Sequence, residues 1–206
     1  MTLIEVVIVV TFIGFLMIAL LPAMAPRHHG GQRISCENGL KQIATASRVW
    51  AGDNNDKFPM AVSVTNGGAM ELANSGDAAG VFRIMSNELS TAKILYCPAD
   101  EDREYATNWT SGYSAKHVSY FVGVDTTQGD PQAALAGDDN FQFAGNDINS
   151  GLRMMSTNVF YAWNTNRHHS MGNIAMGDGS VQSFTNHGLT NQFWTTNFSV
   201  IRLAIP

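Results

Sequence analysis

The sequence has little charge, few cysteines and few basic residues. Only 14% of its 206 residues are charged, which is low for a cytosolic protein and suits an exported, closely packed assembly. Two cysteines, Cys36 and Cys97, make neither a zinc-finger set nor a Cys-x-x-Cys redox pair. From Asp53 onward, 15 acidic side chains outnumber 8 basic ones. Nucleic acid is therefore not expected as the main partner, because phosphate binding needs a basic face.

Charge is absent altogether from Val6 to Met24, a run of 19 residues. As a helix it is long enough to cross a bilayer. No basic residue precedes it, as one would in a secretory signal peptide, and Pro26 would follow the cut at a cleavage-like Ala23-Met24-Ala25. We therefore interpret the run as an anchor. A carboxylate in lipid is costly, so its neighbour Glu5 is expected to have a partner or a function. The alternative is that Glu5 reaches the lipid headgroups.

The N-terminal motif carries a family resemblance. Met1-Thr2-Leu3-Ile4-Glu5-Val6, with Gly14 and Pro22 further on, resembles the mature N-terminus of the type IV pilin and type II secretion pseudopilin superfamily. The resemblance implies that a prepilin peptidase exposes and methylates Met1, where the family usually has Phe. It also implies that Glu5 pairs with the amine of a neighbouring subunit. Helical order is expected to be lost between Gly14 and Pro22 in the filament, because proline removes a backbone donor.

The pattern after this run predicts an α+β fold. Prolines and Gly30-Gly31 predict a helix break between about residues 22 and 32. A second helix is predicted from Gln32 to about Ala51, with one face formed by Cys36, Leu40, Ile43, Ser47 and Trp50. We expect a long N-terminal helix, broken near residues 14–32, packed on an antiparallel sheet. Three parts follow: 1–26 as membrane anchor or filament core, 27–52 as the packed helix, and 53–206 as the head.

Within the head, the pattern predicts a short apolar helix over 79–85 and strands over 93–97, 118–122 and 158–163. Residues 123–150 read as a long loop rich in Gly, Asp and Asn. The apolar tail, 193–206, is expected to close the sheet. Two further segments, 173–177 and 180–184, flank Asp178-Gly179 and predict a hairpin with a two-residue type I′ turn.

A second motif lies around this hairpin. His168, nine residues and Asp178-Gly179 resemble the His-x9-Asp-Gly motif of a prepilin-processing-associated family of bacterial pseudopilin-like proteins. The likeness extends to residues 38–42 (NGLKQ) and to Cys97-Pro98. A His and an Asp invite a catalytic interpretation, but their spacing supplies no nucleophile or metal as third member. We expect no catalytic residues, and a structural role for His168 and Asp178, hydrogen bonding across the hairpin.

The cysteines and the acidic loop add two expectations. In an exported domain Cys36 and Cys97 are expected to form a disulfide, with two buried free thiols as the alternative. Asp138, Asp139 and Asp147 lie in a segment whose composition loosely resembles the calcium loop of the major pseudopilin. We expect no cofactor, with calcium at these three carboxylates as the alternative.

The sequence thus predicts a non-enzymatic subunit of a type IV pilus-like extracellular filament, a homopolymer assembled through its N-terminal helix. A prepilin peptidase, an assembly ATPase and a membrane platform are implied partners by resemblance, and the inner membrane holds the precursor. One alternative is a type II secretion pseudopilin forming a periplasmic piston. Another is a membrane-tethered metal-dependent hydrolase using His168 and Asp178. Adhesion, motility, secretion and DNA uptake all stay open as roles.

Overall fold

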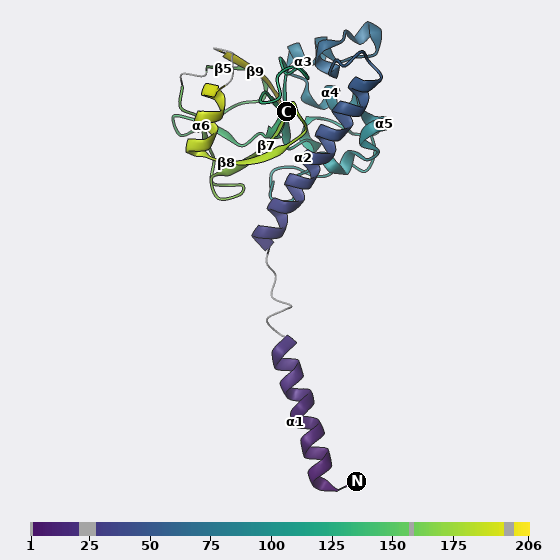
Figure 1. The fold of residues 1–206 in the computed structure, drawn as a ribbon, viewed down its shortest axis with the longest axis vertical. Helices are drawn as coiled ribbons and strands as arrows, with labels where there is room; N and C mark the ends of the chain where they lie inside the picture. Colours follow the sequence, from purple (N-terminus) through teal and green to yellow (C-terminus); the bar gives the residue numbers. More distant parts are fainter. Residues whose placement is uncertain (1, 21–27, 157–158, 196–199) are drawn as a thin grey trace. The chain divides into compact units, whose positions relative to one another are not determined.

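The computed structural model describes residues 2–20, 28–156, 159–195 and 200–206 (Figure 1). The chain divides into two compact units, Met1–Gly31 and Gln32–Pro206. The first unit contains helix α1, Leu3–Leu20, and the start of α2, His28–Gly52. The predicted division into two helices is confirmed, since α1 ends at Leu20 and α2 begins at His28. The predicted start of the second helix at Gln32 is wrong, because Gly30 and Gly31 lie inside α2.

Helix α1 is apolar on all sides. Its large apolar side chains are between 43% exposed at Val6 and 83% exposed at Leu3. A helix with this composition has no polar face to turn toward water, so it is stable only where something apolar surrounds it. Within the described residues, no helix is both long and apolar enough to span a membrane. The predicted run from Val6 to Met24 extends into residues 21–27, which lie outside the described part.

The head consists of α2, several short helices and nine strands among the described residues. The other helices are α3 Met70–Ser75, α4 Ala78–Ile84, α5 Ser86–Leu89 and α6 Asn186–Thr195, with 3-10 turns at η2 Pro59–Ala61, η3 Val64–Asn66, η4 Ala92–Leu95 and η5 Ala115–His117. The strands are β1 Tyr120–Gly123, β2 Ala134–Asp138, β3 Phe141–Phe143, β4 Asn146–Asp147, β5 Gly151–Ser156, β6 Ala162–Trp163, β7 Met171–Met176, β8 Val181–Thr185 and β9 Val200–Ile205.

Six strands form the main sheet, in the order β5-β9-β1-β2-β7-β8, and every pair in it is antiparallel. Strand β9, the last in the sequence, lies between β5 and β1, where Leu152 and Val122 both face Ala204 in the register. The tail therefore does join the sheet, at an inner position. Strands β4, β3 and β6 form a second, smaller sheet.

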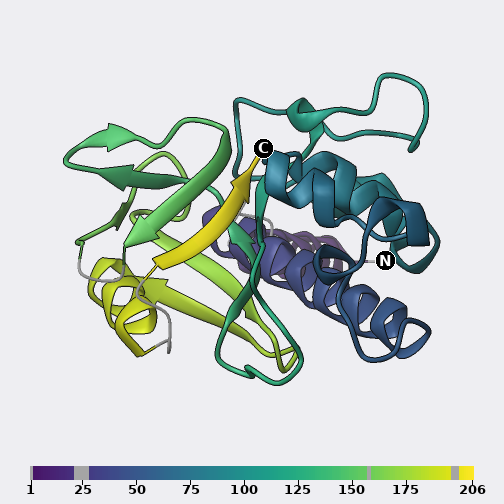
Figure 2. The ribbon, with the colours of Figure 1, turned by 90° about the horizontal axis from the view of Figure 1, so that it is seen from above.

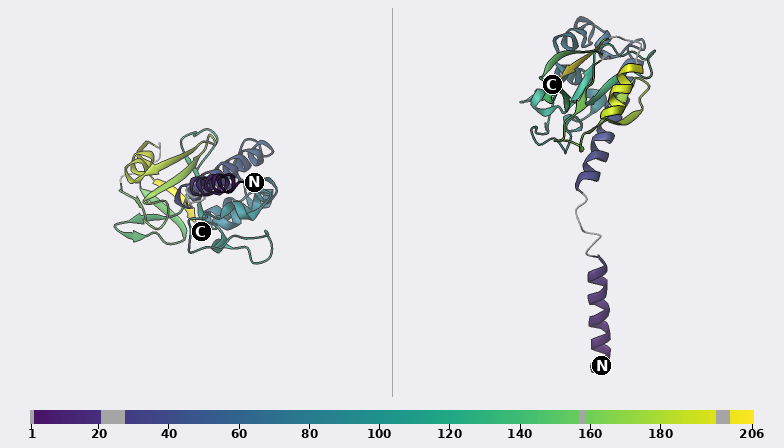
Figure 3. Two further views of the ribbon diagram at one scale, coloured as in Figure 1. Left: turned by 90° about the horizontal axis from the view of Figure 1, so that it is seen from below. Right: turned by 90° about the vertical axis from the view of Figure 1, so that its left-hand side faces the viewer.

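Both faces of the main sheet are covered. Figures 2 and 3 show α2, α3 and α4 on one side of the strands and α6 on the other. Strand β1 alternates between the two resulting cores, because Tyr120 and Val122 pack with the helices while Phe121 packs with Phe141 and Ile174 on the opposite face. A sheet covered on both faces explains why β1 and β2 are buried along their whole length.

The apolar stripe of α2 is confirmed. Cys36, Leu40, Ile43, Ser47 and Trp50 are all buried, and the buried hydroxyl of Ser47 donates to the carbonyl of Ile43 one turn earlier. Gly39 lies on the same side. A Cβ there would lie 3.2 Å from the hydroxyl oxygen of Tyr120, so the glycine lets α2 approach the sheet closely.

Two strand predictions and one loop prediction fail. Residues 92–95 form the 3-10 turn η4. The Ser119 amide donates to the Leu95 carbonyl and the Cys97 amide donates to the Ser119 hydroxyl, which does not make a strand ladder. Of 158–163 only β6 is a strand, and residues 157–158 lie outside the described part. The predicted loop 123–150 contains β2, β3 and β4. Strand β2 (ALAGD) was missed because alanine and glycine are poor strand formers, yet their small size lets both faces be packed.

The hairpin β7–β8 is confirmed, but its turn differs from the prediction. The Met176 amide donates to the Ser180 carbonyl, and the Gly179 amide donates to the Met176 carbonyl, so the loop contains three residues. Among 177–179, Gly179 is the residue with positive φ (89°). This is the pattern of a type I turn followed by a left-handed glycine, which needs one positive φ where a type I′ turn needs two.

Candidate functional site

The His-x9-Asp-Gly motif is divided between two places. His168 precedes β7 and Asp178 follows it, so the six-residue strand separates them by roughly 20 Å. At the turn, Asp178 Oδ1 accepts from the Ser180 amide at 2.8 Å, and hydrogen bonding to Ser180 lowers the pKa of Asp178. Its carbonyl accepts from the Arg48 guanidinium of α2. Asp178 and Gly179 thus shape the turn that rests on α2, while His168 acts elsewhere.

His168 lies in the interior, beside the disulfide. Its side chain is 1% exposed, and its Nε2 lies 3.8 Å from Asp138 Oδ2 and 3.4 Å from Cys97 Sγ. The backbone at His168, His169 and Ser170 has φ of 50°, 53° and 61°, a left-handed turn that directs the imidazole inward. Burial, together with the positive charge of Arg167, lowers the pKa of His168 to about 4.

The predicted disulfide between Cys36 and Cys97 is confirmed, with 5.1 Å between the two Cα atoms. Both cysteines are fully buried. The bond joins the second turn of α2 within the head to the segment that follows η4, two parts of the chain 61 residues apart. It therefore fixes the helix against the loop that carries Asp100 and Arg103.

A buried ionic network lies close to this disulfide. Arg167 Nη2 lies 2.6 Å from Asp139 Oδ1 and 3.1 Å from Asp100 Oδ2, and Arg167 Nη1 donates to the Ser119 carbonyl at 3.2 Å. Arg103 Nη2 lies 2.5 Å from the other oxygen of Asp139. Two cations and two anions balance, which is what burial of charge requires. Asp100, although it follows Pro98 in an acidic segment, is 1% exposed.

Asp138 is a third buried carboxylate beside this network. Burial raises the pKa of Asp138 to about 7, although the backbone amide of Asn173 donates to its Oδ2 at 2.7 Å. Its other oxygen, Oδ1, is buried and has no hydrogen-bond partner among the described residues. At a pH midway between these two values, Asp138 and His168 are therefore both mostly uncharged.

The three calcium candidates occupy different surroundings. Asp139 is neutralised by Arg103 and Arg167, and Asp138 lies against Asn173 and His168. Asp147 is exposed on β4, and its Oδ1 accepts from the side-chain amides of Gln142 and Asn164. The structure brings Asp138 and Asp139 into one buried cluster with internal cations, and leaves Asp147 at the surface.

The N-terminal candidates are described in part. Glu5 Oε2 accepts from the Thr2 amide at 2.7 Å, which places the carboxylate at the positive end of the α1 dipole. Gly14 lies inside α1. Met1 and Pro22, the predicted methylation site and one end of the predicted unwound segment, lie outside the described residues.

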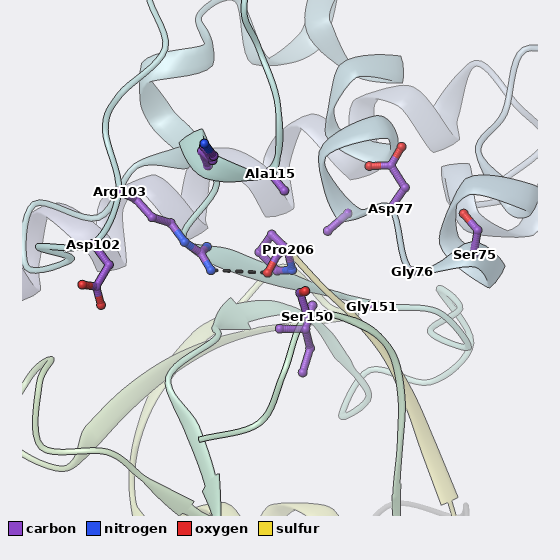
Figure 4. Close-up of a pocket in the computed structure, with 12 residues that line it drawn as sticks. Ser75, Gly76, Asp77, Asp102, Arg103, Ala115, Ser150, Gly151 and Pro206 are labelled. Carbon is purple, nitrogen blue, oxygen red and sulfur yellow. Dashed lines mark hydrogen bonds between the residues drawn. The ribbon is translucent and has the colours of Figure 1, made fainter. Parts of the chain in front are cut away.

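One cavity opens at the edge of the main sheet. It has a volume of about 490 Å³ and lies between Asp77 at the start of α4 and Pro206 at the end of β9 (Figure 4). Arg103, on its wall, donates to the Pro206 carbonyl at 3.4 Å. The same guanidinium group is already paired with Asp139. We therefore interpret this cavity as a gap beside the ionic network and not as a binding site.

No family model, curated protein or solved structure matches this chain. The family resemblances therefore rest on the short motifs themselves.

Sequence reasoning missed Arg103, Arg167 and Asn173. Each bonds to a carboxylate at least 28 positions away, so no local pattern marks it. One signal in the sequence could have indicated Arg167. Only 14% of the chain is charged, so an arginine directly before the motif histidine is uncommon and suggests a specific partner. Its acidic partners could not be assigned without the sheet topology.

Proposed function

We propose that this chain is a structural subunit of a type IV pilus-like extracellular filament, assembled through its N-terminal helix. The observation that carries the proposal is the surface of α1, where thirteen large apolar side chains between Leu3 and Ile18 are exposed. If burial adds about half of the usual 1.5–3 kcal/mol for each, the helix gains on the order of 10 to 20 kcal/mol when lipid or other helices cover it. Membrane storage followed by polymerisation supplies both environments.

Glu5 is the proposed assembly residue. Within the part of the chain that the structure describes, its carboxylate accepts from the Thr2 amide. In a filament core it would need a cation, and by resemblance that cation is the N-terminal amine of a neighbouring subunit. Such a pair gains Coulomb energy and costs desolvation, so it would act mainly by setting the register between subunits.

The second helix supports the same proposal. Its buried stripe holds the head, while Ile34 and Val49 on α2 remain 60% and 54% exposed. These side chains provide apolar surface on which neighbouring subunits would pack. The buried disulfide and the low charge of the head suit a filament outside the cell.

The test is electron microscopy of shed surface material from producing cells, with mass spectrometry of its main protein. Wild-type cells should yield long filaments made of this chain, and Glu5→Ala cells few or none. Glu37→Ala removes an exposed carboxylate of α2 that pairs with Lys41, and it should leave the filament yield unchanged. A non-reducing mass measurement should show the disulfide intact in all three.

Two outcomes would overturn the proposal. Wild-type filament yield in Glu5→Ala cells would mean that Glu5 only caps α1 or reaches the headgroups. Short periplasmic assemblies without surface filaments would favour the type II secretion piston. We do not propose the metal-dependent hydrolase, because His168 and Asp178 lie at opposite ends of β7.

A further inference from the structure

One group of side chains among the described residues has the composition of a metal site. The ligand atoms of Cys36, Cys97 and His168 all lie within 4.8 Å of one another. They come from α2, from the segment after η4 and from the turn before β7. Both cysteines are fully buried, and the His168 side chain is 1% exposed. The disulfide occupies both sulfurs in the oxidised chain, so the question is what the same residues do as thiols.

The distances fit tetrahedral zinc with one adjustment. Zinc binds sulfur at about 2.3 Å and nitrogen at about 2.05 Å, so a tetrahedral angle places N and S about 3.6 Å apart. His168 Nε2 lies 3.4 Å from Cys97 Sγ. Two zinc-bound sulfurs lie about 3.8 Å apart, which is further apart than two bonded sulfurs. Reduction frees each sulfur to rotate about its own Cα–Cβ bond, and this rotation is the adjustment required.

Asp138 lies beside His168 but outside the group of three, and its side chain would have to rotate to complete the set. Its Oδ2 lies 3.8 Å from His168 Nε2, while two zinc-bound N and O atoms lie about 3.4 Å apart. The carboxylate is fully buried, and its Oδ1 has no hydrogen-bond partner among the described residues. A buried oxygen without a partner is costly, and a metal bond would satisfy it.

We propose that Cys36, Cys97, His168 and Asp138 form a zinc site when the two cysteines are thiols. Each thiol releases one proton as its sulfur binds, and the Asp138 carboxyl group releases its proton where it is protonated, so the site then carries two thiolates, a carboxylate and Zn²⁺, a net charge of −1. Positive charge from Arg33 and Arg167 acts on His168 and offsets it. Zinc would join α2 to the segment after η4 while the cysteines are thiols. When a disulfide-containing oxidant takes two electrons from the two thiolates and is itself reduced to a dithiol, the Cys36–Cys97 bond forms and Zn²⁺ is released. This inference is independent of the filament proposal.

The test is a metal titration of the full-length chain in detergent, without oxygen. A phosphine reduces the disulfide, taking oxygen from water to become the phosphine oxide while the two sulfurs gain hydrogen. Co²⁺ should then bind at one per chain, with an intense sulfur-to-cobalt band in the near ultraviolet and visible bands of tetrahedral cobalt. Zn²⁺ should abolish these bands. The oxidised chain should show none of them.

Variants assign the ligands. His168→Ala should weaken zinc binding by at least about 100-fold, and Asp138→Asn by about 10- to 100-fold. His187→Ala, at an exposed histidine of α6, should bind like wild type. His168→Cys should restore tight binding with a stronger charge-transfer band, which excludes misfolding as the cause of the loss.

The near-ultraviolet circular dichroism of the reduced chain provides a second measurement. If reduction loosens the head, one equivalent of zinc should restore its signal. Absence of the cobalt bands in the reduced wild-type chain, or their persistence unchanged in His168→Ala, would overturn the proposal.

Discussion

Replacing Arg167 by Met tests whether the buried ionic network holds the head together. Methionine fills most of the volume but leaves Asp139 with Arg103 alone, and Asp100 with the more distant Arg103 Nε at 3.8 Å. It also removes the donor to the Ser119 carbonyl. Removing one partner of a buried ion pair typically costs 3–5 kcal/mol. Because Arg103 still neutralises one carboxylate, we expect about 3–4 kcal/mol, or roughly 6–16 °C in Tm at 2–4 °C per kcal/mol.

The assay is thermal unfolding of the full-length chain in detergent, followed by near-ultraviolet circular dichroism at pH 7 and pH 4.5. Burial already raises the pKa of Asp139, and loss of Arg167 should raise it further. A carboxyl group whose pKa is raised in the folded state lowers the stability of the protein as pH rises. The loss of stability in Arg167→Met should therefore be smaller at pH 4.5 than at pH 7.

Two further variants complete this test. Lys41→Met breaks an exposed pair with Glu37 at 2.7 Å and should change stability by less than about 1 kcal/mol. Adding Asp139→Asn to Arg167→Met should recover part of the loss, since it removes a charge that lacks its main partner. A Tm for Arg167→Met equal to that of Lys41→Met would refute the reasoning.

Two other predictions concern the same interior. Replacing both cysteines by serine should lower the free energy of unfolding by roughly 4 kcal/mol, which is what the loop-entropy model gives for the 61-residue separation. Urea unfolding measures this loss, and an unchanged midpoint would mean that the bond contributes nothing. In the disulfide-bonded chain, the lowered pKa of His168 (about 4) removes stability as pH falls below 6.5, whereas the raised pKa of Asp138 (about 7) removes it as pH rises above 4. The two effects oppose each other between pH 4.5 and 6.5. As pH rises through this range, the free energy of unfolding should therefore fall in His168→Gln and rise in Asp138→Asn, by up to about 1.4 kcal/mol per pH unit. Equal slopes in both variants would contradict this assignment.

The sequence by itself determined the two N-terminal helices, the short helix α4 and the hairpin. Helix α2 could be predicted because its buried side chains recur at steps of three and four, a signal contained within 20 residues. The hairpin β7–β8 was equally local, since Asp178-Gly179 separates two segments of strand-forming residues. The cysteine pairing needed only the count, because two cysteines allow one intramolecular bond.

Only the tertiary structure decided the inner strands and the buried polar cluster. Strand β2 has no apolar alternation to recognise, because both of its faces are covered and small residues fit between the layers. Arg167 meets Asp100 and Asp139 from positions 67 and 28 residues away, and His168 meets Cys97 across 71. The charge and burial of such groups depend on which strands become neighbours, and that order is set by burial summed over the whole sheet and not by the residues beside them in sequence.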